Sequence, residues 1–303
     1  MKEFDIIVIG GGSGGQIIDA ALRHGLSAAL IDKGPLGGTC LNFGCIPSKM
    51  IIYPADRVIE IKESKKLGIS AEIKNIDFQK IMKHMKDPIK ESHKHMKEGL
   101  KQPIKNFKYY NEEINFVDDY TINVNGEKIK GKKIFIGSGA RPLIPSIKGL
   151  EKIDFLTNEN VFNITKKPES LIIVGGGYIS VEFAHFFSAM GTKVTILQRS
   201  NRLLKNAEPE ISDLLKKQMD KRMKILLNFN VTEVKKDNDK TTVFGKDKVS
   251  AEMKSYSAER ILIATGRKSN ADTLKLENTG VELDDRGYIK VNEFLETSKK
   301  MPT

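Results

Sequence analysis

The sequence predicts an α/β fold built from two similar units, each with a parallel β-sheet. A short apolar stretch that runs into a glycine cluster and then into a helical pattern occurs twice, near the N-terminus and again from Ser170. The chain has 303 residues, long enough for about two domains. An alternating stretch in between carries Asn125-Gly126, which predicts a hairpin turn.

The first unit begins with a buried strand, FDIIVI, over residues 4–9. Gly10, Gly12 and Gly15 follow in a G-x-G-x-x-G pattern, and a helix and a second strand ending at Asp32 come next. In such a turn Gly10 allows the tight bend, Gly12 lets the backbone approach a pyrophosphate, and Gly15 lets the helix pack on the strand. Asp32 lies 20 residues after Gly12, where an acid binds ribose hydroxyls. The combination predicts a dinucleotide site, whereas the glycines alone would predict only a turn.

The second unit repeats this order in SLIIVGGGYISVEFAHFFSAMGTKVTILQRS. A strand leads into Gly175 and Gly177, and a helix and a strand over residues 193–197 follow. Ser180 takes the third glycine position, and its small side chain still allows close packing. A second dinucleotide site is therefore predicted.

The residues at the acid position differ between the two sites. The second unit has Gln198 there, followed by Arg199 and Arg202. A carboxylate would repel a 2′-phosphate and arginines accept one, so the second site favours NADPH over NADH. The alternative is that both arginines are ordinary surface charges at a strand end. The first site keeps its acid, which suits FAD.

The net charge of +11 has three possible explanations. The lysines are spread along the whole chain, aromatic residues make up 7%, and tryptophan is absent, so a solvated surface is favoured over nucleic-acid binding. Attraction of anionic cofactors is compatible with either. No apolar run approaches the ~18 residues of a membrane helix, and no signal peptide is evident, so we expect a cytoplasmic protein with no membrane partner.

A lysine-rich segment over residues 74–101 has a helical pattern. Its methionines are interpreted as filling a core, not as metal ligands. The apolar anchors of this helix are Ile76, Phe78, Ile81, Met82, Met85, Ile89 and Met96.

The only two cysteines, Cys40 and Cys45, lie in GGTCLNFGCIPSK. Two cysteines cannot form a disulfide framework for this length. A zinc site would need two further ligands, and the five histidines are scattered, so no metal is predicted. Between two dinucleotide sites, a redox-active pair is favoured over an incidental pair or a structural disulfide. A helix is predicted from Cys45, whose thiol would face a flavin while Cys40 exchanges with substrate, and Lys49 lies on the same helix face.

These motifs together resemble the FAD-dependent pyridine nucleotide–disulfide oxidoreductases. The resemblance rests on G-x-G-x-x-G, GGTCLNFGCIPSK, GGGYISVEFA and ILIATGR, and it spans residues 4 to about 297. The family includes dihydrolipoamide dehydrogenase and the glutathione, mycothione and mercuric reductases. The cysteine segment looks most like dihydrolipoamide dehydrogenase, and KMIIYPADRV and GRKSNADTL look similar to the NADPH-dependent mycothione reductases.

The resemblance implies a role for each matching residue. Cys45 is the flavin-side thiol, Cys40 the interchange thiol, and Lys49 pairs with Glu182 beside the flavin. The implied FAD contacts are Asp32, Lys33 and Thr39, beside Gly10, Gly12 and Gly15 of the first glycine turn. Ser138-Gly139 and Thr265-Gly266-Arg267, which contains Gly266, match the two turns that close over cofactor. Tyr178 matches the residue that gates the nicotinamide pocket. The other positions predicted for the second dinucleotide are Gly175, Gly177, Ile179, Gln198, Arg199 and Arg202.

The resemblance also implies a domain arrangement of two Rossmann-like domains of the three-layer ββα type. Residues 1–148 with 271–303 would form an incomplete FAD-binding domain, and residues 149–270 an NAD(P)-binding domain. The family's C-terminal dimerisation domain, with its His–Glu pair, has no counterpart before Thr303. We therefore expect a truncated chain with weak FAD retention. The longer form would be a homodimer and this chain would not.

The predicted function is electron transfer between NAD(P)H and a dithiol or disulfide through FAD and a Cys40–Cys45 disulfide. The substrate would be a small molecule or a lipoyl group, and the resemblance points first to a dihydrolipoyl dehydrogenase type. The alternatives are an NADPH-dependent reductase of low-molecular-weight disulfides, a mercuric reductase, and an inactive nucleotide-binding fragment.

Overall fold

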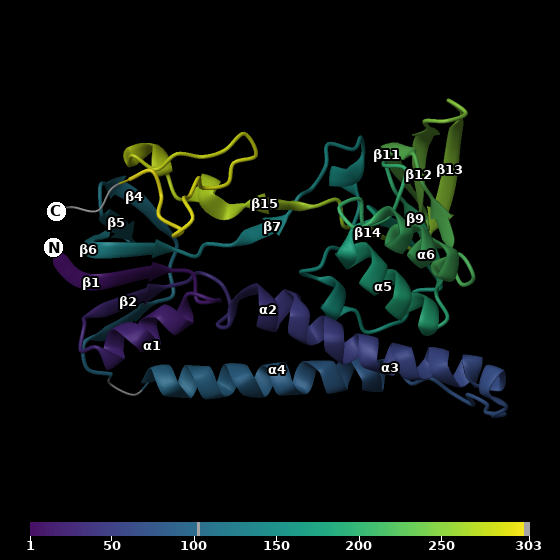
Figure 1. Ribbon diagram of the computed structural model, residues 1–303, viewed down its shortest axis with the longest axis horizontal. Helices are drawn as coiled ribbons and strands as arrows, with labels where there is room; N and C mark the ends of the chain where they lie inside the picture. The colour runs from purple at the N-terminus through teal and green to yellow at the C-terminus, as the bar shows by residue number, and fades with distance from the viewer. Residues whose placement is uncertain (102–103, 300–303) are drawn as a thin grey trace. The chain divides into compact units, whose positions relative to one another are not determined.

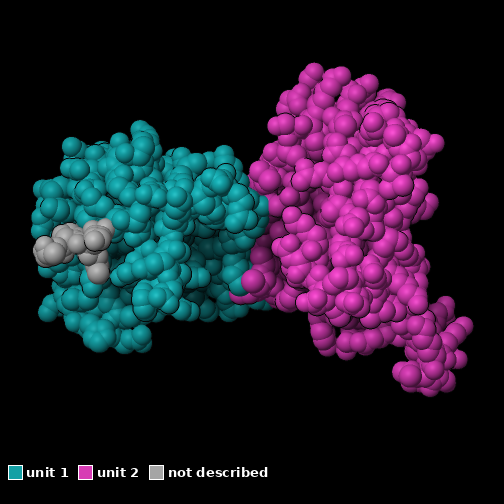
Figure 2. All heavy atoms as spheres, turned by 45° about the horizontal axis from the view of Figure 1, so that its top comes forward, with its two compact units in different colours: residues 1–42, 88–141, 267–303 teal, residues 43–87, 142–266 magenta. Residues whose placement is uncertain are grey.

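The computed structural model describes residues 1–101 and 104–299, which divide into two compact units (Figures 1 and 2). Unit 1 contains residues 1–42, 88–141 and the chain from 267, and unit 2 contains residues 43–87 and 142–266. The two units are defined by how compactly their residues pack and not by what they bind, so the division into FAD-binding and NAD(P)-binding domains stays a prediction. No helix in the described part of the chain is long and apolar enough to span a membrane.

Unit 1 is built on a six-stranded sheet with the order β3-β2-β1-β6-β5-β4. Strands β1, β2 and β3 and the adjacent β6 pair in parallel, and β6, β5 and β4 form an antiparallel meander. Asn125 and Gly126 both have positive φ between β5 and β6, which confirms the predicted hairpin turn. The strands are β1 (Lys2–Ile9), β2 (Ala28–Ile31), β3 (Phe107–Tyr110), β4 (Ile114–Asp118), β5 (Thr121–Val124) and β6 (Glu127–Ile136).

Both faces of this sheet are buried, which explains why its first strands are continuously apolar. Helix α1 (Gly15–Arg23) packs on β1 and β2 through Ile18 and Ala21. On the other face, Ile7 and Ile31 pack with Phe116 and with residues of the returning segment after 267. Packing on both faces holds β1 and β2 in place, and the glycine turn begins at the carboxyl end of β1.

Unit 2 contains a four-stranded parallel sheet, β10-β9-β8-β14, and a three-stranded antiparallel sheet, β11-β12-β13. Phe229, Val234 and Val243 of the antiparallel sheet pack on Ile172 and Ile261 of the parallel sheet. Helix α5 (Tyr178–Ala189) covers the other face of β8 and β9. The strands are β8 (Ser170–Val174), β9 (Lys193–Leu197), β10 (Lys224–Leu226), β11 (Phe229–Asp237), β12 (Lys240–Asp247), β13 (Met253–Ala258) and β14 (Arg260–Ile263). This arrangement confirms the predicted α/β class and its ββα layering.

The remaining elements connect these sheets. They are α2 (Gly38–Phe43), α3 (Cys45–Glu63), α4 (Phe78–Lys101), α6 (Pro209–Met219) and the paired short strands β7 (Ala140–Pro142) and β15 (Arg267–Ser269). The helix predicted over 74–101 begins four residues later, at Phe78. Phe78, Met82, Met85 and Ile89 are buried, so the apolar stripe fills a core as predicted.

The glycine turn after β1 corrects one assignment made from the sequence. A Cβ on Gly14 would lie 2.5 Å from Gly10 O and 2.6 Å from Val8 Cγ1, whereas a Cβ on Gly15 would meet nothing within 4 Å. The residue that lets α1 approach β1 is therefore Gly14, not Gly15. The helix starts at such an angle that its preceding residue, and not its first, faces the strand.

This geometry predicts opposite effects for two adjacent substitutions. Gly14→Ala should lower the free energy of unfolding by about 1–3 kcal/mol, because its Cβ overpacks the turn. Gly15→Ala should be neutral or stabilise by up to about 1 kcal/mol, because alanine restricts the unfolded chain. Urea denaturation of both variants measures the difference, and equal losses would contradict the assignment.

Candidate functional site

The turn after β1 is closed by the end of β6. Gly10 has φ +102°, and a Cβ there would lie 2.1 Å from Gly137 O. The Gly10 N–H donates to Ile31 O at 2.8 Å, and the Gly137 N–H donates to Ile9 O at 2.7 Å. No side chain fits at Gly10, so the backbone of this turn stays bare and accessible to a ligand at the carboxyl end of the sheet.

Asp32, at the end of β2, fixes the position of this turn. Its Oδ2 accepts the Gly11 N–H at 2.6 Å, and its Oδ1 accepts the Gly34 N–H at 2.8 Å. A carboxylate has about four acceptor positions, so Asp32 can also accept hydrogen bonds from ribose hydroxyls. The carboxylate thus already holds the glycine turn and the next loop in place, and its predicted contact with a ribose stays a prediction.

A second bare backbone segment lies directly on the first. Gly37 and Gly38 both have positive φ, and a Cβ on Gly38 would lie 2.5 Å from Gly12 Cα. The Asn42 side-chain amide donates to Pro35 O, Leu36 O and Gly38 O at 3.2, 3.0 and 2.8 Å. These bonds hold the loop that leads into the cysteine segment.

Gly38 and Asn42 were not assigned a role from the sequence. The Gly-Gly pair was a visible signal, because two glycines in succession permit positive φ and close backbone approach. The contact partner of Gly38 and the three acceptors of Asn42 depend on tertiary structure.

The two cysteines lie on successive helices. Cys40 is within α2, Cys45 is the first residue of α3, and both are exposed. The loop before Cys45 is anchored because the Asn158 amide donates to Phe43 O at 3.2 Å. Thr39, a predicted FAD contact, precedes Cys40 on α2.

Helix α3 meets α5 through a row of polar contacts. Lys49 Nζ forms an ion pair with Glu182 Oε1, which is the contact that the resemblance implies for these two residues. Further along, Lys62 Nζ donates to Ala189 O at 3.4 Å. These contacts place the Lys49 ammonium one helical turn after Cys45, while its role in the reaction stays a prediction.

His185 occupies the middle of the same row. Its Nδ1 lies 3.1 Å from Arg222 Nη2, and its Nε2 lies 2.9 Å from Asp56 Oδ1. Arginine only donates, so Nδ1 is unprotonated and the ring proton is on Nε2, which donates to Asp56. Burial, followed by the positive charge of Arg222, lowers the pKa of His185 below its ordinary value.

The second glycine turn repeats the closure of the first. Gly175 has φ +119°, and a Cβ there would lie 2.2 Å from Ala264 O. The Gly175 N–H donates to Leu197 O and the Ala264 N–H to Val174 O, both at 2.9 Å. At the start of α5, Gly177 and Tyr178 are exposed and Ile179 is half-buried.

The loop after β9 is held by Gln198. Its Nε2 donates to Ser200 Oγ at 2.6 Å and to Arg202 O at 3.2 Å, and its Oε1 accepts the Arg199 N–H at 3.1 Å. The Arg199 side chain is exposed and that of Arg202 is half-buried. Among the residues that the structure describes, neither guanidinium has an ion pair, so both are available for an anion.

The other predicted cofactor residues lie on two further turns and one loop. Asn270 holds the Ser138-Gly139 turn, because its amide donates to Ser138 O at 2.8 Å and its N–H to Gly139 O at 3.1 Å. Gly266 O accepts the Leu143 N–H at 3.0 Å. Lys33 forms an ion pair with Glu113 at 3.0 Å.

The lowered pKa of His185 predicts a pH dependence of stability. The unfolded chain takes up a proton at about pH 6.5, before the folded chain does, so stability is lost as the pH falls below that value toward the folded pKa. The urea midpoint should therefore fall more between pH 7.5 and 5.5 in the wild type than in His185→Gln. His84→Gln, at an exposed position of α4, is the matched control and should behave as wild type. The same fall in all three proteins would contradict this assignment.

Comparison with known proteins agrees with this geometry. Mercuric reductase of Staphylococcus aureus is 31% identical over 300 residues, which cover 98% of this chain and 54% of that protein. Dihydrolipoyl dehydrogenase of Geobacillus stearothermophilus is 33% identical (98% and 63% covered), and mycothione reductase of Mycobacterium tuberculosis is 32% identical (99% and 65% covered). The chain thus spans about half to two thirds of the length of these relatives.

A solved structure and a family model match as well. The Cu(II) complex of the HOCl-induced flavoprotein disulfide reductase RclA from Escherichia coli superposes with a TM-score of 0.85 at 26% identity, covering 98% of this chain and 64% of that one. The model of the pyridine nucleotide-disulphide oxidoreductases matches residues 4–301. The chain therefore belongs to the pyridine nucleotide-disulphide oxidoreductase family.

Proposed function

We propose that this chain binds FAD in unit 1 and a nicotinamide dinucleotide in unit 2, and that electrons pass between NAD(P)H and a dithiol or disulfide substrate through Cys40 and Cys45. The observation that supports this most directly is the contact of Gly38 with Gly12. It joins the cysteine segment to the backbone turn that would hold the flavin dinucleotide.

The residues of unit 1 fit a dinucleotide of this kind. The backbone at Gly10 and Gly38 leaves no room for side chains, and the bare backbone of this turn, Gly12 included, permits a pyrophosphate to approach. Asp32 retains acceptor capacity for a ribose. Thr39 and the Ser138-Gly139 turn are the further proposed contacts. A bound flavin supplies the two-electron exchange between NAD(P)H and the cysteine pair.

The chain's own residues carry out the sulfur chemistry. The Cys40 thiolate attacks a substrate disulfide, which forms a mixed disulfide and releases one substrate thiolate. The Cys45 thiolate then attacks the Cys40 sulfur, which releases the second substrate thiolate and leaves a Cys40–Cys45 disulfide. Two electrons have moved from the cysteine pair to the substrate, and the reverse sequence oxidises a dithiol.

Lys49 and Glu182 are proposed to act beside this pair. The ammonium of Lys49 supplies a positive charge close to the start of α3, and Glu182 fixes its position. The first turn of α3 also favours a thiolate at Cys45, because the free N–H groups of a helix start stabilise negative charge.

Dihydrolipoyl groups are the first proposed substrate class, because the cysteine segment looks most like that of dihydrolipoamide dehydrogenase. A low-molecular-weight disulfide reduced with NADPH is supported by the mycothione reductase relative and by Arg199 and Arg202. Mercuric ion is a further candidate because mercuric reductases are among the relatives. Assays of one FAD-loaded preparation with dihydrolipoamide and NAD⁺, with a disulfide and NADPH, and with Hg²⁺ and NADPH separate the three.

Substitution of either cysteine tests the proposed sulfur exchange. Cys40→Ser and Cys45→Ser should each abolish NAD(P)H-dependent disulfide reduction, because the exchange needs both sulfurs. Electron transfer from NAD(P)H to an artificial acceptor such as ferricyanide should remain in both variants, because it bypasses the sulfurs. Retention of disulfide reduction in either variant, measured as thiol release, would contradict the proposal.

Substitution of Arg199 tests the proposed preference for NADPH. Arg199→Glu should lower the preference for NADPH over NADH about 10- to 100-fold, because a charge-assisted contact with the 2′-phosphate is lost. Lys193→Glu makes the same charge change at the opposite end of β9 and should leave the ratio of kcat/KM values unchanged. An equal change of the NADPH-to-NADH ratio in both variants would contradict the proposed contact of Arg199, because net charge alone would then explain the effect.

A further inference from the structure

Unit 2 contains a polar cluster to which the proposed reaction assigns no role. His185 of α5 lies at its centre, with Nε2 2.9 Å from Asp56 Oδ1 of α3 and Nδ1 3.1 Å from Nη2 of Arg222, which lies between α6 and β10. Burial lowers the pKa of Arg222, whereas the charges of Glu63 and Asp56 raise it. We call Asp56, His185 and Arg222 the His185 cluster, in which three elements of unit 2 meet at one imidazole.

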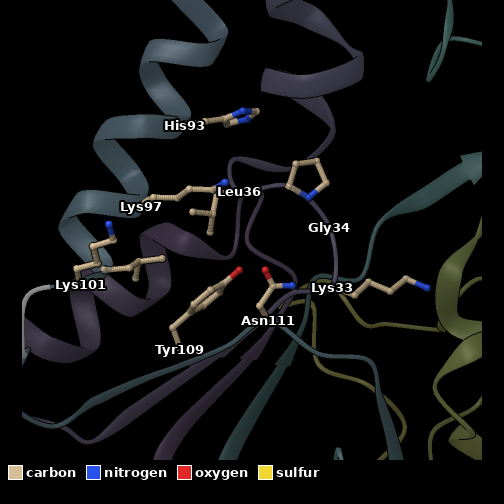
Figure 3. A pocket seen from close by; sticks show the side chains of 10 residues that line it. Lys33, Gly34, Leu36, His93, Lys97, Lys101, Tyr109 and Asn111 are labelled. Atoms are coloured by element: carbon tan, nitrogen blue, oxygen red, sulfur yellow. The ribbon is translucent and has the colours of Figure 1, made fainter.

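The His185 cluster is not part of the cavity of about 510 Å³ that Figure 3 shows in unit 1. Lys33 and Gly34 line that cavity and directly follow Asp32, so the cavity belongs to the proposed dinucleotide site. All three residues of the His185 cluster lie in unit 2, and none of them lines it. The cluster therefore needs an explanation of its own.

His185 joins the same two helices as the ion pair of Lys49 and Glu182. Glu182 precedes His185 by three residues on α5, which is about one helical turn. Lys49 precedes Asp56 by seven residues on α3, which is about two turns. Both contacts therefore lie along one seam between α3 and α5, and a shift of one helix along the other would separate both pairs.

The two contacts differ in how firmly they fix the helices. The side chains of Lys49 and Glu182 are 63% and 35% exposed, and an ion pair with such access to water holds its geometry weakly. The His185 side chain is only 20% exposed, and both of its nitrogens bond to charged groups, which makes these hydrogen bonds stronger than neutral ones. Among the described residues, no other side chain accepts a hydrogen bond from the Arg222 guanidinium. The polar part of the seam is therefore fixed mainly at His185.

We propose that His185 is a positioning residue, which holds α5 against α3 and thereby keeps the Glu182 carboxylate opposite the Lys49 ammonium. This inference rests on the proposed function, in which the ammonium acts beside the cysteine pair. His185 touches neither the cysteines nor the ion pair, so it acts only through the placement of the two helices.

The hydrogen bonds of His185 can be removed without a change of charge. Burial, followed by the positive charge of Arg222, lowers the pKa of His185, so the ring is neutral at pH 7.5. A neutral ring accepts a hydrogen bond at Nδ1 and donates one at Nε2. A glutamine amide offers the same acceptor and donor, whereas leucine offers neither. His185→Gln and His185→Leu therefore differ in hydrogen bonding and not in charge.

Carbodiimide cross-linking of the 303-residue chain at pH 7.5 tests the proposal, because it joins a lysine to a carboxylate only where the two are in contact. Mass spectrometry gives the yield of the Lys49–Glu182 amide relative to that of Lys148–Glu233, an ion pair elsewhere in unit 2. His185→Leu should lower this ratio about threefold or more, because two hydrogen bonds that hold the seam are lost. His185→Gln should keep the wild-type ratio. An unchanged ratio in His185→Leu, or an equal loss in His185→Gln, would overturn the proposal.

A second matched pair of variants keeps the test decisive if His185→Leu does not fold, which loss of the Lys148–Glu233 cross-link would reveal. Asp56→Ala and Asp56→Asn remove the same charge, but only asparagine keeps a carbonyl acceptor for the Nε2 proton of His185. Asp56→Ala should lower the ratio and Asp56→Asn should retain most of it, and equal ratios in the two would overturn the proposal. The cross-links form without FAD or turnover, so a chain that reduces no disulfide would count against the proposed function alone.

Discussion

Both units depend on one constraint, the backbone contact that closes each glycine turn. In unit 1 the position of a Gly10 Cβ is occupied by Gly137 O, and in unit 2 that of a Gly175 Cβ is occupied by Ala264 O. In each case the turn is also hydrogen-bonded to the neighbouring parallel strand. Three segments distant in sequence therefore meet at the carboxyl end of the sheet, where a dinucleotide can contact bare backbone.

In unit 1 this constraint extends to the segment that carries Cys40. The Gly38 backbone lies against Gly12, and Asn42 holds the intervening loop through three carbonyl groups. In unit 2, α3 carries Cys45 and is fixed to α5 by the contacts of Lys49, Asp56 and Lys62. Cys40 thus lies in a segment of unit 1 that backbone packing holds, and Cys45 begins a helix of unit 2 that polar side chains hold.

The local patterns in the sequence were sufficient for the fold class and for most element positions. The strand over residues 193–197 and the Asn125-Gly126 turn occur as predicted, because both depend on alternation and on residues that tolerate positive φ. The sequence could not show that Gly14, and not Gly15, lets α1 approach β1, because this depends on the angle at which α1 leaves the turn. The His185–Asp56 contact joins residues 129 positions apart, and no local pattern encodes it.

The central claim is that the cysteine pair accepts electrons from a nicotinamide cofactor through a flavin held by this chain. Thiol alkylation followed by mass spectrometry of the oxidised, FAD-loaded chain tests it most directly. Anaerobic addition of NADPH should convert Cys40 and Cys45 together from unreactive to alkylated, and only when FAD is present. Alkylation that does not depend on NADPH, or that occurs equally without FAD, would contradict the account.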